Sequence, residues 1–172
     1  MLDVKEIQRR VHALLEQNDI VRPPVPVEQI VENIGLEIRY GPFEGDLSGA
    51  FVRDKDETFI GVNSKDALTR QRFTIAHELA HFLYHKDINV HVDKGFQIIP
   101  RNGRSAQGID PHEMVANRFA AELLIPTEFL ARDIRRLKAV NRGTLDALAK
   151  RYKASGRAMR IRLGNFGIFL PD

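Results

Sequence analysis

The residues best suited to chemistry lie in TIAHELAHFLYH, residues 74–85, where His77, His81 and His85 are spaced four apart and Glu78 follows the first. Histidines at i and i+4 lie one above the other on a helix face, so His77 and His81 can reach one metal ion. Zinc accepts neutral imidazole and leaves one tetrahedral position to water. Glu78 would take a proton from that water as general base and hand it to the leaving amine. The spacing therefore indicates a hydrolytic zinc site.

An alternative is a buried helix whose histidines hydrogen-bond locally. Apolar residues fill the other faces of this segment, and burying His77, Glu78 and His81 there without a partner would cost roughly several kcal/mol. A metal removes that cost, so we favour zinc. His85 lies about 80° around the helix from His77 and is predicted to contact the site's surroundings or a loop.

A third protein ligand must be histidine or carboxylate, because the chain has no cysteine. The segment HEMVANRFAAELLIP offers Glu113 and Glu122 on one predicted helix. The two are about half a turn apart, so only one of them can face the metal, and the geometry alone gives no preference.

The elements around these residues predict an α+β fold. We expect helices over 3–17 and over 27–35, the second ended by Gly35, and three short strands, LEIRY, DLSGAFVR and TFIGVN. Short connections predict a small antiparallel three-stranded sheet packed on the active-site helix, which runs to about Lys86. Residues 87–110 are expected to be a long irregular excursion, followed by a helix over 111–125.

The predicted domains are a zincin-like metallopeptidase domain over 1–126 and a basic helical subdomain over 127–172. Between Arg132 and Arg162 there are 11 Lys and Arg against 2 Asp and Glu, although the whole chain carries only +3. TLDALAKRYKASGRAMRIRLGNFG has the cadence of a helix-turn-helix, which allows DNA contact. The simpler interpretation is a helical cap that recognises a protein substrate, so DNA contact is not the expectation we favour.

The N-terminal MLDVKEIQRRVHALLEQ resembles neither a signal peptide nor an anchor, and no apolar run is long enough to span a membrane. A cytoplasmic location, with no membrane partner, is the expectation.

The runs RQRFTIAHELAHFLYH and EMVANRFAAELLIP together resemble the ImmA/IrrE zinc metallopeptidases, thermolysin-like H-E-x-x-H enzymes of the gluzincin type. PPVPVEQIVENIGLEI, SGAFV and the asparagine that closes TFIGVN fit the same family, so the resemblance covers about residues 10–168. The only departure noted is Ile125, where methionine is more usual; this exchange is apolar for apolar.

The resemblance implies that His77 and His81 bind zinc, that Glu78 is catalytic and that Glu113 is the third ligand. It also implies that Asn117 hydrogen-bonds a zinc histidine. By analogy with the family, the substrate would be a helix-turn-helix repressor or antitoxin encoded nearby.

The expected function is therefore zinc-dependent hydrolysis of a peptide bond in a specific regulatory protein. The alternatives are a DNA-binding transcriptional regulator with a structural or vestigial zinc site, and an antitoxin-like interaction module. A second group that stabilises the oxyanion stays open among His112, His85, Tyr84 and His91. An extended substrate could add to an exposed sheet edge, with LSGAFV or TFIGVN as the expected edge.

Overall fold

The computed structural model of the chain describes residues 3–55, 57–84, 90–93 and 110–170. These residues form an α+β fold with seven helices and a four-stranded mixed sheet, which confirms the predicted class. The helices are α1 (Val4–Gln17), α2 (Val27–Asn33), α3 (Leu68–Tyr84), α4 (Pro111–Leu124), α5 (Thr127–Ile134), α6 (Arg142–Tyr152) and α7 (Gly156–Gly164). The strands are β1 (Glu37–Gly41), β2 (Gly49–Arg53), β3 (Thr58–Asn63) and β4 (Val90–Asp93).

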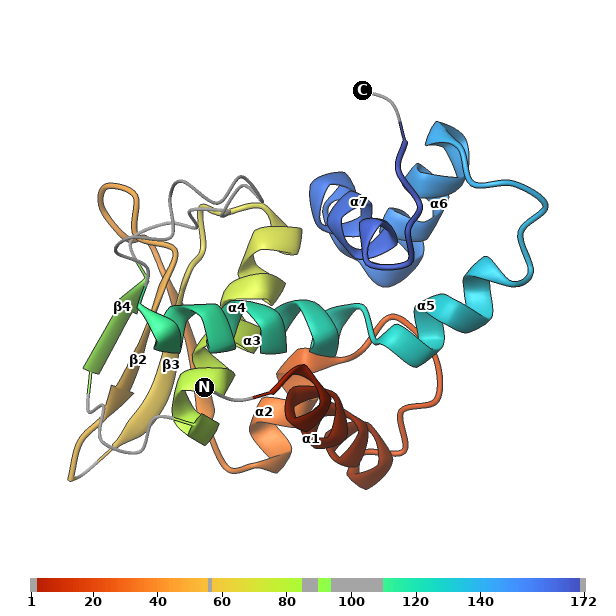
Figure 1. The fold of residues 1–172 in the computed structure, drawn as a ribbon. Helices are drawn as coiled ribbons and strands as arrows, with labels where there is room; N and C mark the ends of the chain where they lie inside the picture. Colours follow the sequence, from red (N-terminus) through yellow and green to blue (C-terminus); the bar gives the residue numbers. More distant parts are fainter. Residues whose placement is uncertain (1–2, 56, 85–89, 94–109, 171–172) are drawn as a thin grey trace.

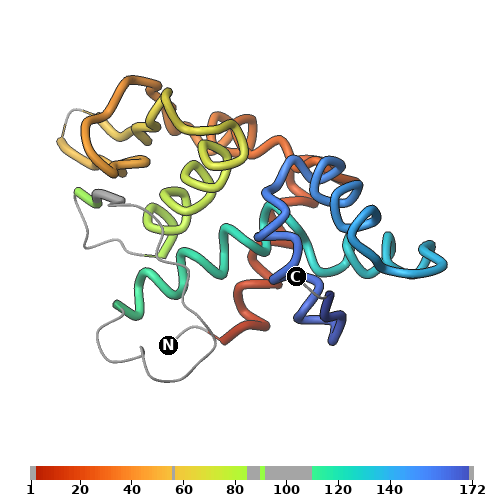
Figure 2. The backbone as a smooth tube through the Cα atoms, turned by 90° about the horizontal axis from the view of Figure 1, so that it is seen from above, coloured from red at the N-terminus to blue at the C-terminus, as the bar shows by residue number. Residues whose placement is uncertain are grey.

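The elements lie in a simple order across the molecule (Figure 1). The sheet forms one end, α3 and α4 run through the middle, and α6 and α7 form the other end. Figure 2 shows the same order from above, with β4 on the side of the sheet where α3 and the start of α4 lie. The long helices therefore connect the sheet to the C-terminal helices.

The sheet order is β1-β3-β2-β4, with β1 parallel to β3 and the other two pairs antiparallel. The predicted antiparallel three-stranded sheet is thus wrong in its number of strands and in the direction of β1. The segment 42–48 is the reason, because it is longer than the roughly two to five residues of a typical hairpin loop and skips past β3. Asn63 holds this segment, since its side chain accepts from the Phe43 N–H and donates to the Leu47 carbonyl.

Strands β2 and β3 are paired on both sides, so neither is a sheet edge. The expectation that LSGAFV or TFIGVN forms an exposed edge is therefore wrong. In the part of the sheet that the structure describes, the edge strands are β1 and β4. The expected irregular excursion over 87–110 is also wrong in part, because it contains β4. A strand of four residues leaves too short an alternating pattern to detect in a sequence.

Helix α3 packs closely on the sheet, and Gly49 makes this possible. A Cβ added at Gly49 would overlap the methyl group of Thr74 in α3 and lie 2.9 Å from the Gly61 carbonyl oxygen. Only a residue without a side chain lets the helix backbone come this near to β2. Glycine at this position therefore sets the distance between α3 and the sheet.

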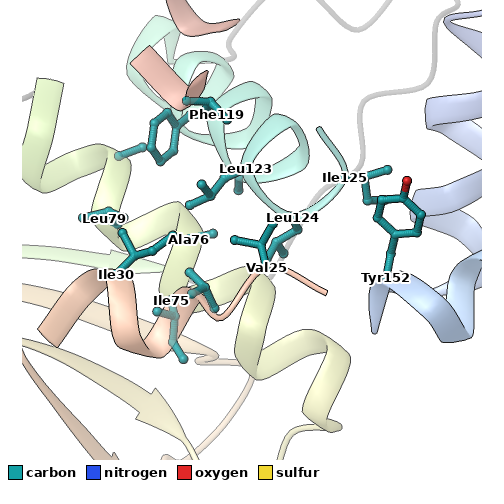
Figure 3. Packing of buried hydrophobic residues seen from close by; sticks show 14 of the residues in the cluster. Val25, Ile30, Ile75, Ala76, Leu79, Phe119, Leu123, Leu124, Ile125 and Tyr152 are labelled. Carbon is teal, nitrogen blue, oxygen red and sulfur yellow. The ribbon is translucent and has the colours of Figure 1, made fainter. Parts of the chain in front are cut away.

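The hydrophobic core lies where α2, α3 and α4 meet (Figure 3). Leu79 of α3 and Phe119 of α4 are fully buried there, as is Ile30 of α2. Gly35 follows α2 with a φ of +88°, and the Leu36 N–H returns to the Val31 carbonyl at 3.1 Å, so the predicted glycine stop is confirmed. None of the described helices is long and apolar enough to cross a membrane.

The C-terminal helices are tied to α4 by a buried ion pair. Arg162 of α7 donates to Glu122 at 2.8 Å and to the Ile125 carbonyl at 2.7 Å. Tyr152, fully buried at the end of α6, donates its hydroxyl to Asp133 at the end of α5. These contacts fix α5, α6 and α7 against the end of α4 that is remote from Glu113. The domain boundary at 126–127 stays a prediction.

Candidate metal centre

Helices α3 and α4 bring His77, His81 and Glu113 to one point. His77 and His81 lie on successive turns of α3, and their Nε2 atoms are 3.1 Å apart. Glu113, in the first turn of α4, places one carboxylate oxygen 3.3 Å from Nε2 of His77 and the other 3.1 Å from Nε2 of His81. Since α3 and α4 cross and pack against each other (Figure 1), the same core contacts that stabilise the fold set this triangle.

The dimensions of the triangle fit a metal ion. Ligand atoms around tetrahedral zinc, at about 2.0–2.1 Å from the ion, are separated from one another by about 3.3 Å. The two imidazole nitrogens lie 3.1 Å apart, and each lies 3.1 or 3.3 Å from its own carboxylate oxygen of Glu113, which is close to this edge length. Two imidazoles and a carboxylate are also a donor set that zinc takes readily.

Asn117 fixes the tautomer of His77. Its side-chain oxygen lies 3.0 Å from Nδ1 of His77, so this nitrogen carries the proton and donates it. Nε2 is then left with a lone pair directed at Nε2 of His81. Nε2 of His81 lies 3.1 Å away, a separation that a cation or a proton between the two nitrogens would satisfy. The structure thus prepares His77 as a ligand, in the way that outer hydrogen bonds orient metal histidines.

Glu78 lies next to the triangle and is fully buried. Its Oε2 contacts Nδ1 of His91 at 3.1 Å, whereas its Oε1 has no hydrogen-bond partner among the described residues. Buried polar atoms are nearly always paired, and an unpaired one is often a group with a chemical role. Glu78 therefore has an oxygen ready to accept a proton.

His91 of β4 is the residue that the sequence did not assign. Its Nε2 lies 2.8 Å from Glu113, and its ring stacks on His81 with 3.7 Å between the centroids. His77, His81, His91 and Glu113 together offer ligand atoms that all lie within 4.8 Å of one another. From the sequence, His91 is only one of four candidates for the group that stabilises the oxyanion, and it is not predicted to bind the metal. The pattern Val-His-Val was its only signal, and this is too short to place a strand.

The electrostatics of the group favour the metal-binding ionisation states of Glu113 and His81, and the protonated ring of His91. Burial alone would raise the pKa of Glu113, but its close contacts with the three histidines outweigh burial and hold that pKa well below its usual range. Burial lowers the pKa of His81 more than its hydrogen bond to Glu113 raises it. Burial also disfavours protonated His91, yet its bonds to Glu113 and Glu78 raise the pKa of His91 to about 10. An ionised carboxylate and a neutral His81 are the forms that a metal requires.

The other candidate residues do not join this group. Glu122 accepts hydrogen bonds from Thr127 and from Arg162, so its carboxylate joins the end of α4 to α5 and α7. Tyr84 packs its ring edge-on against Phe119 at 5.7 Å, and His112 is exposed at the start of α4. His85 lies outside the described residues.

The fold and the donor set define a metallopeptidase-like α+β domain built around an H-E-x-x-H helix. The chain belongs to the Peptidase M78 family, the IrrE N-terminal-like domain, whose model matches residues 31–164. Membership of the ImmA/IrrE family is thereby confirmed, and it suggests metallopeptidase activity.

Among solved structures, a Mycobacterium tuberculosis transcriptional regulator is similar to the chain, with a TM-score of 0.63 and 14% sequence identity. The match covers 92% of this chain and 46% of the regulator, so the chain spans less than half of the regulator's length. At this identity the likeness shows the fold alone. No curated protein matches the chain.

Proposed function

We propose that this chain is a zinc-dependent endopeptidase in which His77, His81 and Glu113 bind the metal and Glu78 is the general base. The observation that carries the proposal is the triangle of ligand atoms from α3 and α4, with the buried carboxylate of Glu78 directly beside it. Membership of a metallopeptidase family supports the same reading. Two histidines and one carboxylate are the protein ligands of zinc in thermolysin-like sites, which leave a position for substrate.

Bound zinc would polarise the scissile carbonyl and make a water molecule nucleophilic at neutral pH. Within the chain, Asn117 holds His77 in the tautomer that presents Nε2 to the metal. Glu78, with an unpaired oxygen in a buried environment, accepts the proton of the attacking water and delivers it to the leaving amine. The surrounding core keeps bulk water from this carboxylate, which strengthens its interactions with charge that develops during the reaction.

The proposed substrate is a helix-turn-helix repressor or antitoxin encoded nearby, and the proposed location is the cytoplasm. The support for this substrate is the family resemblance of the paired motifs. A substrate of this kind would be cut at one site, since a regulated protease must spare other proteins.

The test is to incubate the purified chain, loaded with zinc, with the helix-turn-helix protein encoded beside its gene. Wild type is expected to give one cut that a chelator abolishes. Glu78→Gln should bind zinc normally and lose cleavage by a factor of about 10²–10⁴, the range of a general base. Glu128→Gln, an exposed change on α5, should cut like wild type. Equal cleavage by the Glu78 variant would contradict the proposed mechanism.

A second candidate function is DNA binding by α6 and α7. Its support is the likeness in fold to a transcriptional regulator, together with the basic C-terminal part. The arginines of α7 weigh against it, because Arg162 is buried in its ion pair and Arg160 donates to the Leu170 carbonyl at 2.9 Å. Arg157 is the exposed arginine of this helix.

Gel-shift titration of the full chain at several salt concentrations tests DNA binding. Binding through phosphates should weaken steeply as salt rises, and Arg157→Glu should reduce both the affinity and the salt slope. An affinity that Arg157→Glu leaves unchanged would exclude α7 as the DNA-reading helix.

A further inference from the structure

The ring of His91 bridges the general base and the third metal ligand. Nδ1 lies 3.1 Å from Oε2 of Glu78, and Nε2 lies 2.8 Å from Oε1 of Glu113. One face of this ring stacks on the ring of His81, with an angle of 17° between the two rings. His91 therefore fills the space between Glu78 and the metal triangle.

This space is the one that a nucleophilic water needs. A water that Glu78 activates must lie within hydrogen-bond reach of this carboxylate and next to the metal at the same time. His91 already uses Oε2 of Glu78 and already contacts Glu113. As long as His91 stays there, it competes with the water for the same corner of the site.

We propose that His91 is a fourth metal ligand in the resting protein, an inference that rests on the zinc site of the proposed function. His91 presents its Nε2 to the same carboxylate oxygen that contacts His81, and all four ligand atoms fall within 4.8 Å of one another. Four protein ligands make a closed, structural type of zinc site, whereas three leave the position that catalysis requires. Because the rings of His81 and His91 are nearly parallel, the His91 ring would have to tilt for its Nε2 to bind the same ion as His81.

The strand that carries His91 is suited to withdraw it. β4 has four residues and lies at the edge of the sheet, where β2 is the strand that it pairs with. His91 lies opposite the buried Phe51 of β2, so a shift of β4 along or away from β2 takes the imidazole out of the site. Helices α3 and α4 can stay in place while this happens, since His77, His81 and Glu113 do not lie on β4. Withdrawal of β4 would thus leave a vacant coordination position on the metal, while His77, His81 and Glu113 stay together.

The number of imidazoles bound to zinc decides the proposal. X-ray absorption at the zinc edge counts them in the full chain, and competition with a chromophoric chelator measures the affinity. Wild type is expected to show three imidazoles per zinc. His91→Ala should show two, with zinc affinity at least about tenfold weaker, because even outer-shell partners change affinity by about 10–100-fold. His91→Asn serves as a second variant if alanine disturbs β4, and His12→Ala, on the exposed side of α1, is the matched control.

Two imidazoles in wild type, with unchanged affinity in both His91 variants, would overturn the fourth-ligand proposal and leave the three-residue zinc site intact. A wild-type chain that binds no zinc, with His77→Ala behaving identically, would overturn the proposed function itself. The two failures are therefore distinguishable in one set of measurements.

Discussion

Asn117 shows how one side chain sets the chemistry of another. Its oxygen accepts from Nδ1 of His77, which leaves Nε2 as the ring nitrogen that faces His81 and Glu113. The role of Asn117 was implied by the family resemblance and not by spacing alone. An asparagine on a helix has many possible partners, and only the packing of α4 on α3 selects His77.

At this residue, Asn117→Ala is expected to weaken zinc binding by about 10–100-fold, because His77 loses the hydrogen bond that fixes its tautomer. Asn117→Asp keeps an acceptor at the same position and should bind zinc at least as well as wild type. Chelator competition measures both. A full-strength site in the alanine variant would show that His77 is oriented by something else.

Gly49 lets α3 pack closely on β2, and a substitution at this position tests how much stability that packing provides. Gly49→Ala is expected to lower the free energy of unfolding by about 1–3 kcal/mol, because the added methyl group overlaps Thr74 and approaches the Gly61 carbonyl. Gly41→Ala is the matched control, as a Cβ there meets nothing within 4 Å. Urea unfolding of the two variants provides the comparison. Equal losses would mean that the close approach of α3 to β2 is not what requires glycine.

At the scale of elements, the order of the strands was the main failure of the sequence prediction. The strands themselves were recognisable because LEIRY alternates and TFIGVN is rich in residues that favour strands. β2 and β3 fall within the expected ranges, and β1 is displaced by one residue, to Glu37–Gly41. Which strands pair depends on contacts between distant residues, such as those of Asn63 with the segment 42–48. No local pattern encodes that choice.

The ion pair between Glu122 of α4 and Arg162 of α7 is the contact between elements that a single substitution tests most directly. Arg162→Met should lower the free energy of unfolding by about 3 kcal/mol, the lower end of the cost of breaking a buried ion pair. The backbone N–H and the hydroxyl of Thr127 still donate to the carboxylate of Glu122, at 2.8 and 2.9 Å. These two hydrogen bonds keep the decrease in the free energy of unfolding from being larger.

Arg157→Met, an exposed change on the same helix, should stay within about 0.5 kcal/mol of wild type. Zinc affinity should be unaffected in both variants, because Glu122 is not among the residues that surround the metal position. Urea unfolding and chelator competition check the two statements. Loss of zinc binding in the Arg162 variant would mean that Glu122 takes part in the site.

At the scale of the whole molecule, a metal held between α3 and α4 should stabilise the fold. The ligands come from separate helices, so the unfolded chain cannot present them together. Zinc at a free concentration one hundred times its dissociation constant would contribute about 2.7 kcal/mol. For a chain of this size we expect a rise of about 5–10 °C in Tm.

Glu113→Ala should lose this zinc-dependent rise, while Glu122→Gln should keep it at a lower starting Tm. Calorimetry with and without a chelator measures the difference. A rise that persists without Glu113 would place the metal elsewhere in the chain.

The sequence by itself determined the arrangement of the candidate ligands on α3. The spacing of His77, Glu78 and His81 is a local property, since a helix places i and i+4 on one face whatever surrounds it. The sequence also determined the α+β class and the glycine stop after α2, because periodicity and turn residues act over a few neighbours.

Only the tertiary structure decided which glutamate meets the histidines, where β1 and β4 join the sheet, and that His91 reaches the site. Each of these depends on how surfaces far apart in the chain pack together. Glu113 and Glu122 lie on opposite sides of the same helix, so the rotation of α4 against α3 makes the choice between them. That rotation is fixed by the buried residues the two helices share, and no single segment of sequence contains it.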